Sequence, residues 1–133
     1  MKTINLSGSR KKAVARATIK EGTGIVRINK QPINIIEPEI SRLRLQEPLE
    51  IATDYAKKVN IDIKVAGGGS QSQIEACRLA IAKSIYAFSN KKPQLRIDFL
   101  AYDRHLLVAD TRRNEPHKPN DSKPRAKRQF SKR

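Results

Sequence analysis

The clearest pattern of apolar and polar positions is a strict alternation, which occurs in two separate stretches of the chain. It covers residues 13–20 and residues 59–65. Because successive side chains of a strand point to opposite faces, this period of two predicts two half-buried strands. The glycine-containing turn at residues 21–24 and the apolar residues 25–29 extend the first strand into a predicted β-hairpin. A short strand at residues 4–6 is expected beside it.

A period of three to four residues appears in the second half of the chain and predicts one long helix. The apolar residues on its inner face are Ile74, Cys77, Ile81, Ile85 and Phe88. Ser72 and Glu75 have the spacing of a capping box, which predicts the start of this helix.

Proline positions divide the remaining helical segments. Pro38 and Pro48 favour two helical pieces between residues 33 and 58, because an interior proline breaks the hydrogen-bond ladder. Pro93 can open another helix that ends at residue 99 or 102, and residues 106–108 are typical of a brief strand that returns to the sheet. The order of these elements predicts an α+β fold, a two-layer sandwich with helices on one face of a sheet.

The apolar pattern ends at Asp110, which predicts a globular α+β domain over residues 1–110 and an extended basic tail over residues 111–133. The tail contains three prolines and too few apolar side chains to offset the entropy of its own ordering. We therefore expect it to gain structure with a partner. At full extension, 23 residues span on the order of 75 Å.

Charge indicates what that partner is. The chain has 28 Lys and Arg against 13 Asp and Glu, a formal charge of +15. Residues 111–133 hold nine basic and two acidic residues, whereas the first 110 residues hold nineteen and eleven. This excess predicts a polyanion, most simply a nucleic acid, as the binding partner.

Several classes of protein are disfavoured. One cysteine, Cys77, cannot form an internal disulfide, and together with His105 and His117 it has no metal-site spacing. The acidic residues are scattered singly, so we expect no catalytic site and no cofactor, a structural or surface role for His105, and a core position for Cys77. The single cysteine favours a reduced, cytosolic protein. No apolar run has transmembrane or signal-peptide length, so we expect no membrane contact.

The run Gly67, Gly68 and Gly69 directly precedes the long helix and has two interpretations. Backbone amides at a helix N-terminus can cradle phosphate. Alternatively, the glycines form a tight turn that needs positive φ. The P-loop and dinucleotide-binding patterns are absent, but on a chain of charge +15 the phosphates of a nucleic acid are a competitive occupant.

A basic cluster lies at the entrance to the first predicted strand. Its members are Arg10, Lys11, Lys12 and, on the polar face of that strand, Arg16. Such a run can be a solvated strand end. Together with Arg42, Arg44 and the tail, it can also contact a single polyanion.

Four segments in register resemble the small-subunit ribosomal protein nine family, and they span nearly the whole chain. They are residues 8–16, residues 22–29, residues 65–69 running into 77–82, and residues 129–133. Residues 106–116 are similar to the archaeal and eukaryotic branch of this family.

The resemblance implies a fold like the second domain of ribosomal protein five and a structural, non-enzymatic place in the head of the small ribosomal subunit. It further implies ribosomal RNA, neighbouring head proteins and peptidyl-site transfer RNA as partners, with no small-molecule substrate. The expected ribosomal RNA contacts are Arg10, Lys11, Lys12, Arg16, Gly67, Gly68, Gly69, Arg112, Arg113, Lys118, Lys123 and Arg125. The expected transfer RNA contacts are Arg128, Gln129, Phe130, Ser131, Lys132 and Arg133.

Other functions stay open at this point. The same fold occurs in a class of small-molecule kinases whose glycine-rich loop binds nucleotide, and in the protein of ribonuclease P, so fold alone does not decide between enzyme and binder. The alternatives are a phosphotransferase, a free nucleic-acid chaperone and the ribonuclease P protein. Phe130 can stack on a base or lie between phosphates.

Overall fold

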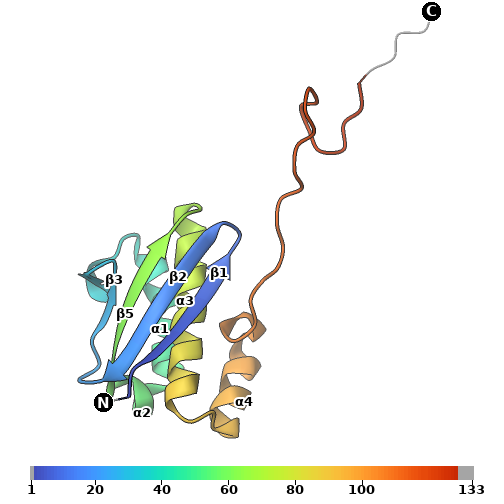
Figure 1. Ribbon diagram of the computed structural model, residues 1–133. Helices are drawn as coiled ribbons and strands as arrows, with labels where there is room; N and C mark the ends of the chain where they lie inside the picture. The colour runs from blue at the N-terminus through green and yellow to red at the C-terminus, as the bar shows by residue number, and fades with distance from the viewer. Residues whose placement is uncertain (1, 129–133) are drawn as a thin grey trace, which may run out of the picture.

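A five-stranded sheet with helices on one face forms the body of the protein in the computed structural model, which describes residues 2–128 (Figure 1). This confirms the α+β fold. The sheet order is β1-β2-β5-β3-β4. The strands are β1 (Ile4–Arg10), β2 (Ala13–Glu21), β3 (Val26–Ile28), β4 (Gln31–Pro32) and β5 (Val59–Ala66). The helices are η1 (Ile33–Ile35), α1 (Glu39–Ile51), α2 (Thr53–Ala56), α3 (Ser70–Phe88), α4 (Pro93–Tyr102) and η2 (Arg104–Leu106).

The core lies between the sheet and α3, and it follows the two periods of the sequence. The buried positions of β2 and β5 alternate as predicted, and they include Ala15, Ile19 and Ile61. On α3, Cys77 and Ile81 are buried on the predicted face. The small alanines of β2 let this helix pack closely against the strands. None of the helices in residues 2–128 is long and apolar enough to cross a bilayer.

The predicted hairpin between residues 13–20 and 25–29 is wrong, because β5 lies between these two segments. β5 pairs antiparallel with β2 and parallel with β3. The turn at residues 22–25 is held by β5 rather than by a tight hairpin: Asn60 Oδ1 accepts hydrogen bonds from the backbone N–H groups of Thr23 and Ile25 at 2.9 and 3.0 Å. The predicted strand at residues 4–6 is confirmed and is longer, since β1 pairs with β2 along its full length.

The helix boundaries differ from the prediction in two places. Pro48 lies inside α1, and the break between the two helical pieces falls at Ala52 instead. The capping box is wrong, because α3 begins at Ser70 without a side-chain cap. Glu75 is directed instead toward Arg10 and Arg44.

The predicted strand at residues 106–108 is also wrong. Asp103 accepts a hydrogen bond from the backbone N–H of His105 at 2.9 Å and starts the short 3-10 helix η2. Leu106 is thereby buried in the core rather than added to the sheet. Beyond η2, the chain through residue 128 forms no helix or strand. It stays in contact with the body as far as Arg112 and then runs away from it (Figure 1).

Candidate nucleic-acid interface

Lys11 and Lys12 form the tight turn between β1 and β2, and this turn packs against the glycine run. Both lysines are exposed. Gly67 and Gly68 have φ values of +78° and +64°, so the need for positive φ is confirmed at these two positions. A Cβ atom on Gly67 would lie 2.6 Å from the carbonyl oxygen of Lys12. The glycines therefore let the loop before α3 lie directly against the backbone of the lysine turn.

Gly69 completes this surface at the start of α3. It is the N-cap residue, no side chain caps the helix, and a Cβ atom added there would meet nothing within 4 Å. The first backbone amides of a helix carry partial positive charge and favour anions. We refer to Lys11, Lys12 and Gly67 to Gly69 as the lysine–glycine edge. The lysine turn and the glycine run are far apart in the sequence, but in the fold they form one positively charged surface on which a phosphate could bind.

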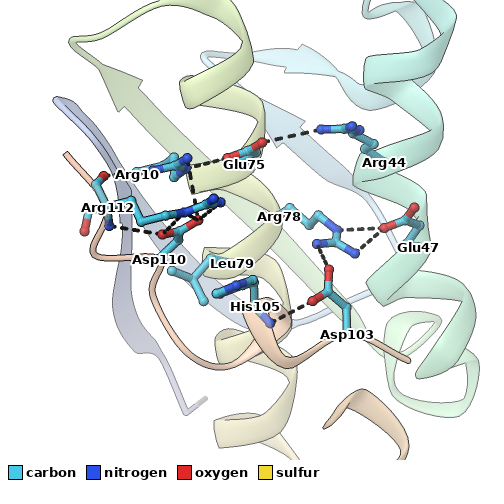
Figure 2. Close-up of a pocket in the computed structure, with 11 residues that line it drawn as sticks. Arg10, Arg44, Glu47, Glu75, Arg78, Leu79, Asp103, His105, Asp110 and Arg112 are labelled. Carbon is cyan, nitrogen blue, oxygen red and sulfur yellow. Dashed lines mark hydrogen bonds and ion pairs between the residues drawn. The ribbon is translucent and has the colours of Figure 1, made fainter. Parts of the chain in front are cut away.

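Arg10, next to this edge in the sequence, is directed toward Glu75 on α3 (Figure 2). Its Nε lies 2.8 Å from Glu75 Oε2, and its Nη1 donates to the backbone carbonyl of Arg112 at 3.0 Å. Its side chain is 13% exposed. The structure therefore gives Arg10 intramolecular partners, and its contact with RNA stays a prediction.

Asp110 joins Arg10 to the base of the tail (Figure 2). The Asp110 carboxylate lies 3.5 Å from Arg10 Nη2 and accepts hydrogen bonds from the side chain and backbone N–H of Arg112. These hydrogen bonds from Arg112, helped by the charge of Arg10, hold the pKa of Asp110 well below its usual range. We refer to Arg10, Glu75, Asp110 and Arg112 as the tail anchor.

A second set of ion pairs lies beside the tail anchor and connects three helical elements (Figure 2). Arg78 of α3 donates from Nε to Glu47 of α1 at 2.7 Å and from Nη1 to Asp103 at 2.9 Å. Desolvation acts against ionisation of Asp103, but hydrogen bonds from the His105 backbone and from Arg78 outweigh it and lower the pKa of Asp103. The His105 ring lies 3.3 Å from the Val108 carbonyl, which suits a structural role.

The cleft between these ion pairs offers little chemistry of its own. It is lined by Arg10, Arg44, Arg78 and Arg112 and by Glu47, Glu75, Asp103 and Asp110. Each of these arginines lies within 4.0 Å of one of the carboxylates, so the cleft is compensated internally rather than poised for an anion. Within residues 2–128, no group of His, Cys, Asp and Glu could hold a metal ion. Burial raises the pKa of Cys77 to about 12, which keeps this thiol protonated and unreactive.

The remaining predicted site residues lie on two other surfaces. Arg16 is exposed on the sheet face that carries no helix. In the tail, Arg113, Lys118 and Lys123 are exposed. The predicted contacts Gln129, Phe130, Ser131, Lys132 and Arg133 lie outside the described residues.

Three tail arginines have acidic partners nearby and are still largely open to solvent. Arg125 is 87% exposed and pairs with Glu115, and Arg128 is 70% exposed and lies 4.0 Å from Asp121. Arg112 of the tail anchor is 79% exposed. The Arg125–Glu115 pair is exposed on both sides and the Arg128–Asp121 contact is at the limit of ion-pair distance, so both contribute little stability and a phosphate can replace either carboxylate at small cost.

Sequence reasoning missed the acidic half of the tail anchor. Glu75 and Asp110 lie far from Arg10 in the sequence, and no spacing rule connects them. The fold brings them together because Arg10 ends β1 on the face that contacts α3, directly beside Glu75. One signal was available in the sequence, because the alternation of residues 13–20 puts Ala13 on the inner face of its strand. Arg10 pairs with Ala13, so its side chain lies on the same face of the sheet.

The whole chain is similar to known proteins of one family. The family model described as ribosomal protein S9/S16 matches residues 8–133. Similar curated proteins include two from strains of Methanococcus maripaludis, each 48% identical, and one from Methanococcus vannielii, 46% identical. Each comparison covers 98% of this chain and 98% of the relative, and all three relatives are named small ribosomal subunit protein uS9.

Proposed function

The chain belongs to the ribosomal protein S9/S16 family, so it is a structural protein of the small ribosomal subunit rather than a member of an enzyme class, and from this membership we propose how it engages RNA. Its partners in the subunit are ribosomal RNA and other ribosomal proteins. The family membership confirms the resemblance found in the sequence. It also removes the reason to treat the glycine run as a nucleotide site.

We propose that the lysine–glycine edge docks on the sugar–phosphate backbone of the ribosomal RNA. Lys11 and Lys12 supply charge, and the amides at the start of α3, beside Gly69, supply hydrogen-bond donors. Within residues 2–128, neither lysine lies within ion-pair distance of an acidic side chain. The observation that carries this proposal is the packing of the glycine loop on the lysine turn. It fixes charges and amides side by side before RNA binds, which lowers the entropy lost on binding.

We propose further that residues 1–110 act as the RNA-binding body and residues 111–133 as a tail, with the tail anchor setting the direction in which the tail leaves. In this arrangement Arg10 acts mainly by positioning Asp110 and Arg112. The tail cations Arg112, Arg113, Lys118, Lys123 and Arg125 then meet phosphates along the path of the tail. Their exposure supports this assignment.

The end of the tail is proposed to contact the peptidyl-site transfer RNA while the protein sits on the ribosome in the cytoplasm. The residues assigned to this contact are Arg128, Gln129, Phe130, Ser131, Lys132 and Arg133. The charge of the tail and the family resemblance of residues 129–133 support it. Contacts of this kind steady the transfer RNA electrostatically and do not read its sequence.

Co-sedimentation with small subunits through a moderate salt wash tests the ribosomal assignment. A Lys11→Gln/Lys12→Gln variant should wash off at lower salt. The control variant Lys57→Gln/Lys58→Gln, which removes the same charge from two exposed lysines between α2 and β5, should not. Removal of residues 131–133 should leave subunit binding intact and reduce transfer RNA occupancy of the peptidyl site. Recovery of the wild-type protein mainly free, or on DNA, would overturn the assignment.

A further inference from the structure

One face of the sheet carries no helix (Figure 1). The exposed side chains of its strands make this face distinctly basic. Every second residue of the strands points to this open face, opposite the buried positions that contact the helices. The exposed cations of the open face are Arg16 and Lys20 on β2, Lys64 on β5 and Arg27 on β3. Asp62 is the acid that the strands place among them. Shallow depressions between Arg16, Asp62 and Lys64 and between Arg27 and Lys64 shape this surface.

Two of these cations lie directly opposite each other. In the antiparallel register of β2 and β5, Arg16 pairs with Lys64. Like charges at directly opposed positions destabilise a sheet. Among residues 2–128, no acidic group lies within ion-pair distance of Arg16, Lys64, Arg27 or Lys20. The isolated protein therefore carries an uncompensated repulsion that a bound anion would relieve.

Two arginines on the helix-covered side of the molecule differ from these cations. There, Arg10 and Arg78 each contact two carboxylates from other elements. Among the described residues, the cations of the open face form no ion pair of this kind, although Asp62 lies opposite Arg27 in the register of β3 and β5.

The chemistry of the open face selects one kind of partner. The described strands contain no aromatic side chain, so they offer no platform on which bases could stack. Val14, 40% exposed, is the large apolar side chain on this face of β2, which is too little for the apolar centre of a protein interface. Cations spread over three neighbouring strands, about 4.8 Å apart, suit a run of phosphates.

We propose that the open sheet face, through Arg16, Lys64 and Arg27, docks on the sugar–phosphate backbone of small-subunit ribosomal RNA as a second contact surface beside the lysine–glycine edge. This inference rests on the proposed function, because it assumes that the body binds this RNA. The contact is non-specific in sequence and sensitive to salt.

The test measures affinity for protein-free small-subunit ribosomal RNA over a series of salt concentrations. Three full-length variants with an equal reduction in charge are compared with the wild type. They are Arg16→Gln/Lys64→Gln for the open face, Lys11→Gln/Lys12→Gln for the lysine–glycine edge, and Lys57→Gln/Lys58→Gln as the control. The open-face variant should reduce the slope of log affinity against log salt by roughly 0.7 to 0.9 for each RNA phosphate that the protein no longer neutralises, and the control should keep the wild-type slope.

A stability measurement on the free protein gives an independent readout. Arg16→Gln should leave the melting temperature unchanged or raise it, because the substitution removes the repulsion with Lys64. A clear fall in the melting temperature would show that Arg16 has a stabilising partner, and it would contradict the proposal.

The remaining outcomes separate this inference from the proposed function. An open-face variant with the wild-type slope, beside a weakened lysine–glycine edge variant, would overturn the open-face contact alone. An open-face variant that binds naked RNA normally but is excluded from assembled subunits would assign the face to a neighbouring protein and would also overturn the proposal. Failure of the wild type to bind RNA or to co-sediment with subunits would reject the proposed function itself.

Discussion

Arg10 and Asp110 lie at opposite ends of the body sequence and meet in space, with 3.5 Å between Arg10 Nη2 and Asp110 Oδ2. Arg10 is the last residue of β1, and Asp110 is the last residue before the tail. The side chains are only 13% and 11% exposed, so water screens the pair less than it screens the pairs further along the tail. We therefore expect the pair to hold the chain to the body where the proposed tail begins.

Asp110→Asn should loosen the base of the tail without unfolding the body. Arg10 keeps Glu75 as a partner at 2.8 Å, so the melting temperature should fall by a few degrees at most. Trypsin cleavage after Arg112 and Arg113 should become about two- to fivefold faster, because local opening at this point becomes easier. Limited proteolysis followed by mass spectrometry measures this rate.

Asp54→Asn is the matched control for this substitution. It removes the same charge at an exposed position of α2, away from the tail anchor. The control should leave cleavage at Arg112 and Arg113 at the wild-type rate. Equal cleavage rates in the wild type and Asp110→Asn would show that the ion pair does not hold the tail.

Acid should destabilise the protein through Asp103 and Asp110. The pKa of each carboxyl is lower in the folded protein than its unfolded value of about 3.9. The folded state therefore gains stability from these groups above that pH, and the gain is lost as pH falls through the folded pKa values. The melting temperature at fixed ionic strength should fall steeply below about pH 4.

Asp103→Asn identifies the source of this acid sensitivity. The variant should be less stable than the wild type at pH 7, because Arg78 loses a charged partner at 2.9 Å, and it should show a shallower decline in acid. Thermal melts from pH 7 to about pH 2.5 measure both effects. Parallel curves for the wild type and Asp103→Asn would contradict the assignment.

The sequence predicted well those elements whose pattern of apolar and polar residues lies within one uninterrupted segment. β2, β5 and α3 each show their own period over seven or more residues, so the local pattern was sufficient to predict them. The insertion of β5 between β2 and β3 was missed because turn chemistry at residues 21–24 is local, whereas strand pairing is decided by segments far along the chain.

In the candidate interface too, features within one segment were predicted, whereas contacts between distant segments were not. Lys11, Lys12 and the glycine run were each visible in the sequence as separate features, and the fold places them together. Side chains with more than one available partner were harder to predict. Glu75 has the spacing of a helix cap, yet a guanidinium 2.8 Å away is the stronger partner, because charge-assisted hydrogen bonds exceed neutral ones.

Gly67 and Gly69 should respond differently to alanine. Gly67→Ala forces a Cβ atom to within 2.6 Å of the Lys12 carbonyl at a φ of +78°, so the free energy of unfolding should fall by about 1–3 kcal/mol. Gly69→Ala meets no atom within 4 Å at a φ of −95°, so it should cost less, within about 1 kcal/mol, because the loss is limited to the poorer N-capping of alanine. Urea denaturation measures both. Equal losses in the two variants would contradict the packing of the glycine loop on the lysine turn.

Leu106 is the last fully buried residue of the described chain, and its truncation should strongly destabilise the body. It is 0% exposed in η2, whereas Val108, two residues on, is 40% exposed. Leu106→Ala removes buried apolar volume and leaves a cavity, so the free energy of unfolding should fall by about 2–4 kcal/mol. Val108→Ala should change it by no more than about 0.5 kcal/mol. Comparable losses in urea denaturation would mean that the core continues past η2 and that the tail begins later than Asp110.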